Sequence, residues 1–264
     1  MTLEHRVATR YVQPLREGGS LPAIVDTDGP EQYVLKFRGA GQGVKALVAE
    51  AIAGGLAQAL ELPLPGMAIV YLAEGFGSGE PDPEIQDLLR ASVGNNFGIQ
   101  YLSGALGFDP KADETHTDAT LASSIVWFDA LITNVDRTPR NTNLLCWHAQ
   151  LWLIDHGASL YFHHGWRPTD RLEGSSDPFV EVREHVLLPW ATALGEAAAH
   201  LGAVFTDELF DRIVEQIPAS WLASDHAFED EADHRAAYVA WLRARAQALP
   251  LLLEEAERAH AQLV

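Results

Sequence analysis

Five side chains in four separate segments have the types and the spacing that phosphoryl transfer requires. Lys36 lies in an apolar stretch that predicts a strand, and Glu50 lies in an apolar stretch that predicts the next helix. Asp136 and Asn141 are separated by four residues in a polar loop, and Asp155 ends a second apolar stretch. The reaction needs a cation for the phosphates, an acid that fixes this cation, a carboxylate that orients the acceptor, and an Asp–Asn pair that binds Mg²⁺. The sequence contains these parts in that order.

The lysine and the glutamate each have an ordinary interpretation when they are considered alone. In the segment YVLKF at residues 33–37, side chains alternate between two faces, so Lys36 shares its face with Val34. An edge-strand lysine whose ammonium reaches water fits this pattern, and a solvated helix position fits Glu50. A carboxylate within an apolar helix nevertheless requires a cation partner, and Lys36 is available across the preceding loop. We therefore expect Lys36 to pair with Glu50.

The two acidic motifs lie in the segments NVDRTPRN, at residues 134–141, and LWLIDHG, at residues 151–157. Asp136-x4-Asn141 has the catalytic-loop spacing in which the Asp accepts the hydroxyl proton and the Asn binds Mg²⁺. Asn143 is a competing ligand, but the four-residue gap favours Asn141. Asp155 and Gly157 form the D-x-G arrangement that supplies a second metal-binding carboxylate. Each motif alone also fits an ordinary turn, so the prediction depends on their combination.

The elements expected around these residues are β-rich early in the chain and helical later. Strands and one helix are expected first, with strands at residues 6–12, 21–25, 32–37, 67–72 and 97–102 and the helix at residues 44–60. A helix at residues 119–132 and a hairpin over residues 143–154 follow, and then helices near residues 191–201, 206–216 and 229–248 and after Pro250. The hairpin brings the Asp136 loop next to Asp155. The fold class is therefore α+β, a bilobal fold with a small β-rich lobe (residues 1–101), a larger helical lobe (residues 102–264) and a cleft between them.

The composition excludes several classes of function. The chain has 264 residues, of which 47% are hydrophobic and 21% are charged, as in folded globular proteins. Its 18 basic and 37 acidic residues give a formal net charge of −19, which disfavours nucleic acid or an anionic membrane surface as a partner. Cys146 is the one cysteine, so no internal disulfide can form. The sequence has no apolar run of ~20 residues and no apolar stretch typical of a signal peptide, which predicts a cytoplasmic protein.

Other common chemistries lack their sequence signatures. The motifs G-x-x-x-x-G-K-[ST], H-E-x-x-H, G-x-S-x-G and C-x-x-C are absent. The segment GAGQG at residues 39–43 lacks the third glycine of a dinucleotide-binding loop, and we interpret it as a flexible connector.

The two acidic segments resemble the HipA-like branch of the protein-kinase-like superfamily. They are also similar to phosphoinositide kinases, in which an arginine directly follows the catalytic aspartate. The resemblance covers roughly residues 18–245 and includes the segments YVLKF at 33–37, LPLP at 62–65, NFG at 96–98 and HVLLP at 185–189. It implies a bilobal kinase fold, the use of ATP with Mg²⁺, and phosphorylation of a Ser/Thr hydroxyl. Residues 97–102 are expected near the hinge that contacts adenine.

The resemblance also implies a role for each candidate side chain. Lys36 binds the α/β-phosphates and pairs with Glu50. Asp136 is the catalytic base, and Asn141 and Asp155 bind the metal ion.

The chain departs from ordinary protein kinases at several positions. No G-x-G-x-x-G precedes the lysine, and only Gly18, Gly19 and Ser20 offer backbone N–H groups for a turn that covers the phosphates. The H-R-D motif is replaced by NVDR, and DFG is replaced by DHG at residues 155–157. There is no A-P-E segment and no segment similar to the extra amino-terminal domain of the full HipA kinases. Regulation and substrate are therefore not implied by the resemblance.

The acceptor of the phosphate is left open by the sequence. A protein Ser/Thr hydroxyl is the leading interpretation, and a small molecule or a lipid head group is the alternative within enzymes. A pseudokinase that binds nucleotide without transfer is the third, although it has no reason to keep all the catalytic side chains. Arg137 and Arg140 are candidates to contact phosphate or acceptor, or else to pair with surface acids. Trp166, Arg167 and the loop at residues 171–177 are candidates for the acceptor site.

Overall fold

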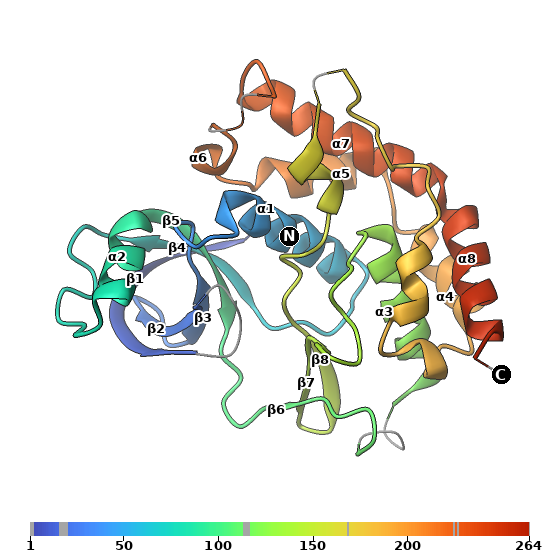
Figure 1. The fold of residues 1–264 in the computed structure, drawn as a ribbon, viewed down its shortest axis with the longest axis horizontal. Coiled ribbons are helices and arrows are strands. Elements are labelled where there is room, and N and C mark those ends of the chain that lie inside the picture. Colours follow the sequence, from blue (N-terminus) through green and yellow to red (C-terminus); the bar gives the residue numbers. More distant parts are fainter. Residues whose placement is uncertain are drawn as a thin grey trace.

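The computed structural model describes residues 3–15, 21–112, 117–167, 169–223, 225 and 227–263. A β-rich amino-terminal part is followed by a helical carboxy-terminal part, so the fold class is α+β as predicted. Figure 1 shows the strands of the first part on one side of helix α1 and the later helices on the other. Among the described residues, no helix combines the length and the apolar character needed to cross a membrane.

Five strands of the amino-terminal part form a closed barrel in the order β1-β2-β3-β5-β4. Their bounds are β1 Glu4–Pro14, β2 Ala23–Thr27, β3 Gln32–Lys36, β4 Met67–Leu72 and β5 Gly94–Gln100. Strands β2 and β3 form an antiparallel hairpin, and β1 and β4 are the two strands of the barrel that pair in parallel. Tyr33, Leu35 and Phe37 are buried inside the barrel. Because side chains alternate along a strand, Lys36 faces away from the barrel core.

Helix α1 (Gly43–Ala59) packs between the barrel and the helical part. Residues 46–57 along it are buried. A helix that is apolar on all sides is typical of a buried position. A glycine in α1 allows a close approach, because a Cβ on Gly55 would lie 2.9 Å from Ile213 of helix α5. The close packing of α1 against α5 fixes the position of Glu50, which lies on this helix.

Helix α2 (Pro83–Ala91) lies in a region, residues 84–96, for which no element was predicted. Its start is defined by Asp82, whose side chain accepts a hydrogen bond from the N–H of Glu84, and by Pro83 at the first position. Ile85 and Leu89 are buried against the interior of the barrel. The acidic, proline-rich segment before this short amphipathic helix is typical of a loop, and the helix was therefore not predicted.

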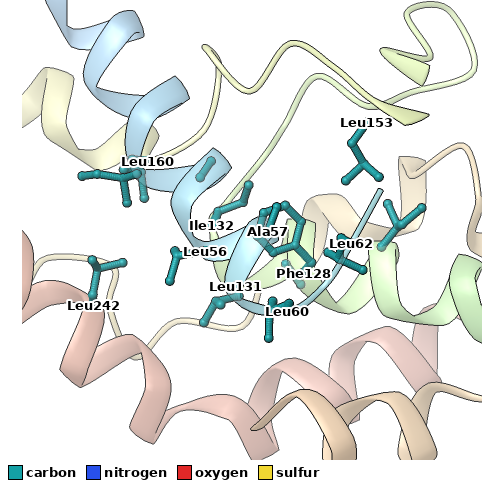
Figure 2. Close-up of a cluster of buried hydrophobic side chains, with 14 of the residues drawn as sticks. Leu56, Ala57, Leu60, Leu62, Phe128, Leu131, Ile132, Leu153, Leu160 and Leu242 are labelled. Carbon is teal, nitrogen blue, oxygen red and sulfur yellow. The ribbon is translucent and has the colours of Figure 1, made fainter. Parts of the chain in front are cut away.

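A second core lies between α1, helix α3 (Ala119–Leu131) and a small sheet. The sheet has the order β6-β7-β8, with β6 Leu106–Gly107, β7 Leu144–Trp147 and β8 Gln150–Leu153. Figure 2 shows Phe128, Leu131 and Ile132 of this core next to Leu56 and Ala57 of α1. The segments before and after the loop that contains Asp136 therefore pack in the same core as α1, the helix that contains Glu50.

The remaining chain forms four helices close to the predicted positions and one short helix, α6, that was not predicted. They are α4 Leu194–Gly202, α5 Asp207–Glu215, α6 Ala219–Leu222, α7 Glu231–Gln247 and α8 Leu249–Ala261, with 3₁₀ turns at Tyr161–Gly165, Val180–Glu184 and Leu188–Trp190. Thr206 caps α5 by accepting a hydrogen bond from the N–H of Leu209.

Candidate active site

Lys36, Glu50 and Asp155 come together from three elements. Lys36 ends β3, Glu50 lies in α1, and Asp155 follows β8. The ammonium of Lys36 pairs with Oε1 of Glu50, and its Nζ lies 2.6 Å from Oδ1 of Asp155. The side chain of Lys36 is 14% exposed and that of Glu50 is 1% exposed, whereas that of Asp155 is 47% exposed. The Lys36–Glu50 pair predicted from the sequence is therefore largely shielded from solvent. Asp155 is the most exposed member of this triad.

The charges of this triad stabilise one another. Burial alone would lower the pKa of Lys36, but Glu50 and Asp155 outweigh it and raise this pKa above its ordinary value. Burial alone would raise the pKa of Glu50, but Lys36 and His156 hold it well below its ordinary value. Lys36 is thus a fixed cation at neutral pH, as a phosphate-binding lysine must be.

The DHG segment lies directly against Glu50. The Nδ1 atom of His156 is 3.7 Å from Oε2 of Glu50, and its ring packs edge-to-face on Phe128. A Cβ on Gly157 would lie 3.3 Å from Oε1 of Glu50, so a side chain at this position would crowd the carboxylate. The histidine and the glycine hold the segment that carries Asp155 close to α1.

Asp136 accepts hydrogen bonds from two asparagine side chains. Its Oδ2 atom lies 2.8 Å from Nδ2 of Asn141 and 3.2 Å from Nδ2 of Asn143. The Nδ2 group of Asn143 also lies 3.4 Å from the carbonyl oxygen of Asp136. Asn141 is exposed, whereas Asn143 is 8% exposed. Both competing candidates therefore contact the aspartate, and the more buried one lies immediately before β7.

The backbone brings Asn143 and Asp155 side by side. The N–H of Ile154 donates to the carbonyl of Asn143 at 3.1 Å, at the end of the β7–β8 ladder. Asn143 has φ +48° and Asp155 has φ +56°, a left-handed conformation that is uncommon for residues other than glycine. Two such residues at one place are typical of a functional site that the surrounding structure constrains.

A buried ionic network supports the loop from below. Asp129 of α3, which is 0% exposed, pairs with the guanidinium of Arg137 through Nε and with Nε2 of His185 at 2.9 Å. Asn134 donates to Asp129 at 3.0 Å, and its own Oδ1 accepts from the N–H of Asp136 at 3.1 Å. Burial would raise the pKa of Asp129, but Arg137 and His185 hold it well below its ordinary value. A charged anchor thus connects α3 to the loop that contains Asp136.

The expectation that Arg137 contacts phosphate, acceptor or surface acids is wrong. Arg137 is 1% exposed, and its Nη1 group donates to the carbonyl of Asn143 and, at 3.3 Å, to that of Ile154. The guanidinium therefore binds the two backbone positions that precede β7 and Asp155. The sequence could not show this role, because the contacts of Asp129 with Arg137 and with His185 form only in the tertiary fold. Arg140, by contrast, is exposed.

Other candidates lie apart from this cluster or outside the described residues. Gly18, Gly19 and Ser20 belong to the part of the chain that the structure does not describe. Trp166 is buried against Phe228 and Tyr238, so it belongs to the core, and Arg167 pairs with Glu173 at the surface. A cavity of about 440 Å³ beside α2 contains none of the candidate residues. Within the described ranges, no group of three or more His, Cys, Asp or Glu side chains could hold a metal ion.

The buried histidines give the fold a pH dependence. Burial lowers the pKa of His163 and of His185 below the ordinary 6.5. Below about pH 6.5 the unfolded chain therefore binds protons that the folded chain does not, and the free energy of unfolding falls by up to about 1.4 kcal/mol per pH unit for each histidine. Glu50 and Asp129 add a further loss as the pH falls through their unfolded values of 4.5 and 3.8.

Urea unfolding at pH 7.5 and pH 5.5 checks this prediction, which expects a lower midpoint at pH 5.5. Replacing the exposed His200 with Gln is expected to leave the difference unchanged. Equal unfolding free energies at the two pH values would contradict it.

Comparison with known proteins agrees with this geometry. The family model described as HipA-like kinase matches residues 9–248. The chain belongs to the HipA-like kinase family. It is thus a kinase, a phosphotransferase, and this family implies the use of ATP.

A solved structure shares the fold of this HipA-like kinase. It is a Helicobacter pylori proinflammatory kinase, CtkA, with a TM-score of 0.58 and 11% sequence identity, and the match covers 99% of each chain. At this identity the likeness concerns the fold alone, and it agrees with the β-rich and helical parts described above. The comparison with curated proteins gave no significant match.

Proposed function

We propose that this HipA-like kinase transfers the γ-phosphoryl group of ATP, with Mg²⁺, to a Ser/Thr hydroxyl of a protein. The observation that carries the proposal is the convergence of Lys36 and Asp155 with the Asp136–Asn143 pair, since the β7–β8 hairpin joins them. In this proposal residues 1–101 form the lobe that binds the phosphates. Residues 102–264 form the lobe that contains the catalytic loop.

Each side chain has a distinct task in the proposed reaction. Lys36 leaves Asp155 and binds the α/β-phosphates, while Glu50 keeps the ammonium in place. Asp136 holds both amides on Oδ2, and Oδ1 has no hydrogen bond to a described residue. Oδ1 is therefore the atom that accepts the proton from the acceptor hydroxyl.

The residues present fit a magnesium site. Mg²⁺ is usually bound by one or two carboxylates together with substrate phosphates, so a cluster of protein ligands is not required. Asp155 offers a half-exposed carboxylate, and Asn143 offers its Oδ1, because its Nδ2 group is used on Asp136. When bound, the metal ion neutralises charge on the β- and γ-phosphate oxygens.

Asn143 is the stronger candidate for the metal-binding asparagine, although the four-residue spacing favours Asn141. Asn143 is buried, lies opposite Ile154 and has its backbone fixed by Arg137. Replacing Asn143 with Ala is expected to raise the Mg²⁺ concentration needed for half-maximal activity at least tenfold. The matched variant Asn141→Ala is expected to change it by less than threefold. Measuring phosphotransfer against Mg²⁺ concentration checks this, and the reverse ranking would assign the metal to Asn141.

The acidic surface supports a protein acceptor with basic residues. The formal net charge of −19 attracts cationic peptides and repels anionic lipid. This favours a protein over a lipid head group, while a small molecule is the alternative that the experiment must separate.

Transfer of labelled phosphate from γ-³²P-ATP in a lysate tests the proposal. We expect label in protein bands and no label with the Asp136→Asn variant. The protein-bound label is expected to have the same sensitivity to base as phosphoserine or phosphothreonine. Label found only in small metabolites would replace the protein acceptor with a small molecule. Absence of transfer, together with no thermal stabilisation by millimolar ATP, would contradict both the protein-kinase hypothesis and the small-molecule-kinase hypothesis.

A further inference from the structure

A cavity of about 330 Å³ lies on the side of α1 away from Glu50. It is bounded by residues of α1, α6, α7 and the α6–α7 connection, namely Val44, Lys45, Val48, Trp221, Asp225, Ala227, His234 and Tyr238. Ala46 and Glu50 face the DHG segment, since both lie next to a Cβ placed on Gly157. At 100° per residue, positions 44 and 48 lie roughly half a turn from positions 46 and 50. Helix α1 therefore separates this cavity from the candidate active site.

Lys45 supplies a partly used cation at the polar end of the cavity. Its Nζ donates to the carbonyl of His163 at 2.5 Å and pairs with Oδ2 of Asp225 at 2.8 Å. An ammonium has three N–H donors, so one donor is left without an acceptor among the described residues. Asp225 is itself held in place, because its Oδ1 accepts from the N–H of Ala227 at 3.0 Å.

His234 supplies an unpartnered acceptor to the same cavity. Its Nδ1 lies 3.3 Å from the carbonyl of Leu222, which requires a hydrogen on Nδ1 and leaves Nε2 as a bare acceptor. The residue is 2% exposed, and Nε2 has no hydrogen-bond partner within the described ranges. Stacking on Phe228, with ring centroids 3.9 Å apart, fixes the plane of the ring. Burial lowers the pKa of His234, so the ring is neutral near pH 7.

A hydroxyl group has both the donor that His234 lacks and the acceptor that Lys45 lacks. It donates its hydrogen to Nε2 of His234 and accepts the remaining N–H of Lys45, whereas an ionised carboxylate has no hydrogen to donate. The other walls, formed by Val44, Val48 and Trp221, are apolar or aromatic. A volume near 300 Å³ is at the lower end of the range for small-molecule sites.

We propose that this cavity is a second, non-catalytic binding site for a small uncharged molecule with a hydroxyl group on an apolar or aromatic body. The ligand lies against the face of α1 opposite Glu50, and its hydroxyl occupies the position between His234 and Lys45. The site is independent of the proposed phosphotransfer, so its test needs no activity.

Titration of the full chain with benzyl alcohol, followed by NMR, tests the site. The indole N–H of Trp221, which donates to the carbonyl of Asn95 at 2.9 Å, reports from the cavity wall. Toluene is the matched probe because it has the same ring without the hydroxyl. We expect a saturable shift of the Trp221 signal with benzyl alcohol and at least tenfold weaker binding of toluene.

Two variants complete the design. His234→Phe is expected to abolish the preference for benzyl alcohol, while His200→Phe, on the exposed surface of α4, is expected to keep it. If His234→Phe does not fold, Lys45→Met removes the other polar group and is expected to reduce the preference as well. Equal affinities of the two probes in the native chain, or no saturable shift with either, would overturn the proposal.

Discussion

Replacing Asp136 with Asn is expected to lower phosphotransfer about 10²–10⁴-fold, the range for loss of a positioned general base. The substitution keeps the size of the side chain and removes the proton acceptor. ATP binding is expected to change little, because Asp136 is hydrogen-bonded to Asn141 and Asn143, whereas Lys36 is bonded to Glu50 and Asp155. The measurement is the rate of transfer at saturating ATP, together with ATP affinity by calorimetry.

The matched control is Asp87→Asn on the surface of α2, where the side chain is 75% exposed. This variant is expected to retain the native rate. A fully active Asp136→Asn variant would show that the proton goes to another group. Loss of ATP binding together with activity would show that Asp136 acts on the nucleotide rather than on the acceptor.

Replacing Arg137 with Met is expected to cost about 3–5 kcal/mol of stability, because it leaves the carboxylate of Asp129 buried without its cation. It is also expected to lower kcat more than it raises KM for ATP. The reason is that the guanidinium fixes the carbonyls of Asn143 and Ile154, and so the spacing of Asn143 and Asp155. Urea unfolding and steady-state kinetics below the unfolding transition measure the two effects.

A double variant separates the two roles of Arg137. Adding Asp129→Asn to Arg137→Met removes the unpaired charge and is expected to recover part of the stability. Activity is expected to stay low, because the two carbonyls still lack their donor. The exposed Arg140→Met is the control, with little effect on either quantity. Full recovery of activity with stability would reduce Arg137 to a purely stabilising residue.

The parts of the site that depend on local pattern could be predicted from the sequence. Alternation along residues 33–37 places Lys36 outside the barrel core, and an apolar helix requires a partner for Glu50; the structure pairs the two. The hairpin that joins the loop containing Asp136 to Asp155 also follows from local sequence. These features need only the period of a strand or a helix and the cost of an unpaired charge.

Features that depend on tertiary packing could not be predicted in this way. The polar segment around Arg137 is typical of an exposed loop. Arg137 is nevertheless buried, because it pairs with the buried Asp129 of α3. Spacing alone cannot rank Asn141 against Asn143, because the ranking depends on where β7 begins and on which backbone carbonyl Arg137 binds. The unpartnered Nε2 atom of His234 likewise could not be predicted, because its surroundings combine residues of α1 and α7, which are distant in the sequence.

The most direct test of the account is a crystal structure of the chain with a non-hydrolysable ATP analogue and Mn²⁺, located by anomalous scattering. We expect the ion to be bonded to the carboxylate of Asp155 and to the side-chain oxygen of Asn143, with the ammonium of Lys36 on the α/β-phosphates. A nucleotide bound elsewhere, with Lys36 still paired to Asp155 and no metal peak beside that carboxylate, would contradict the assignment of this cluster as the active site.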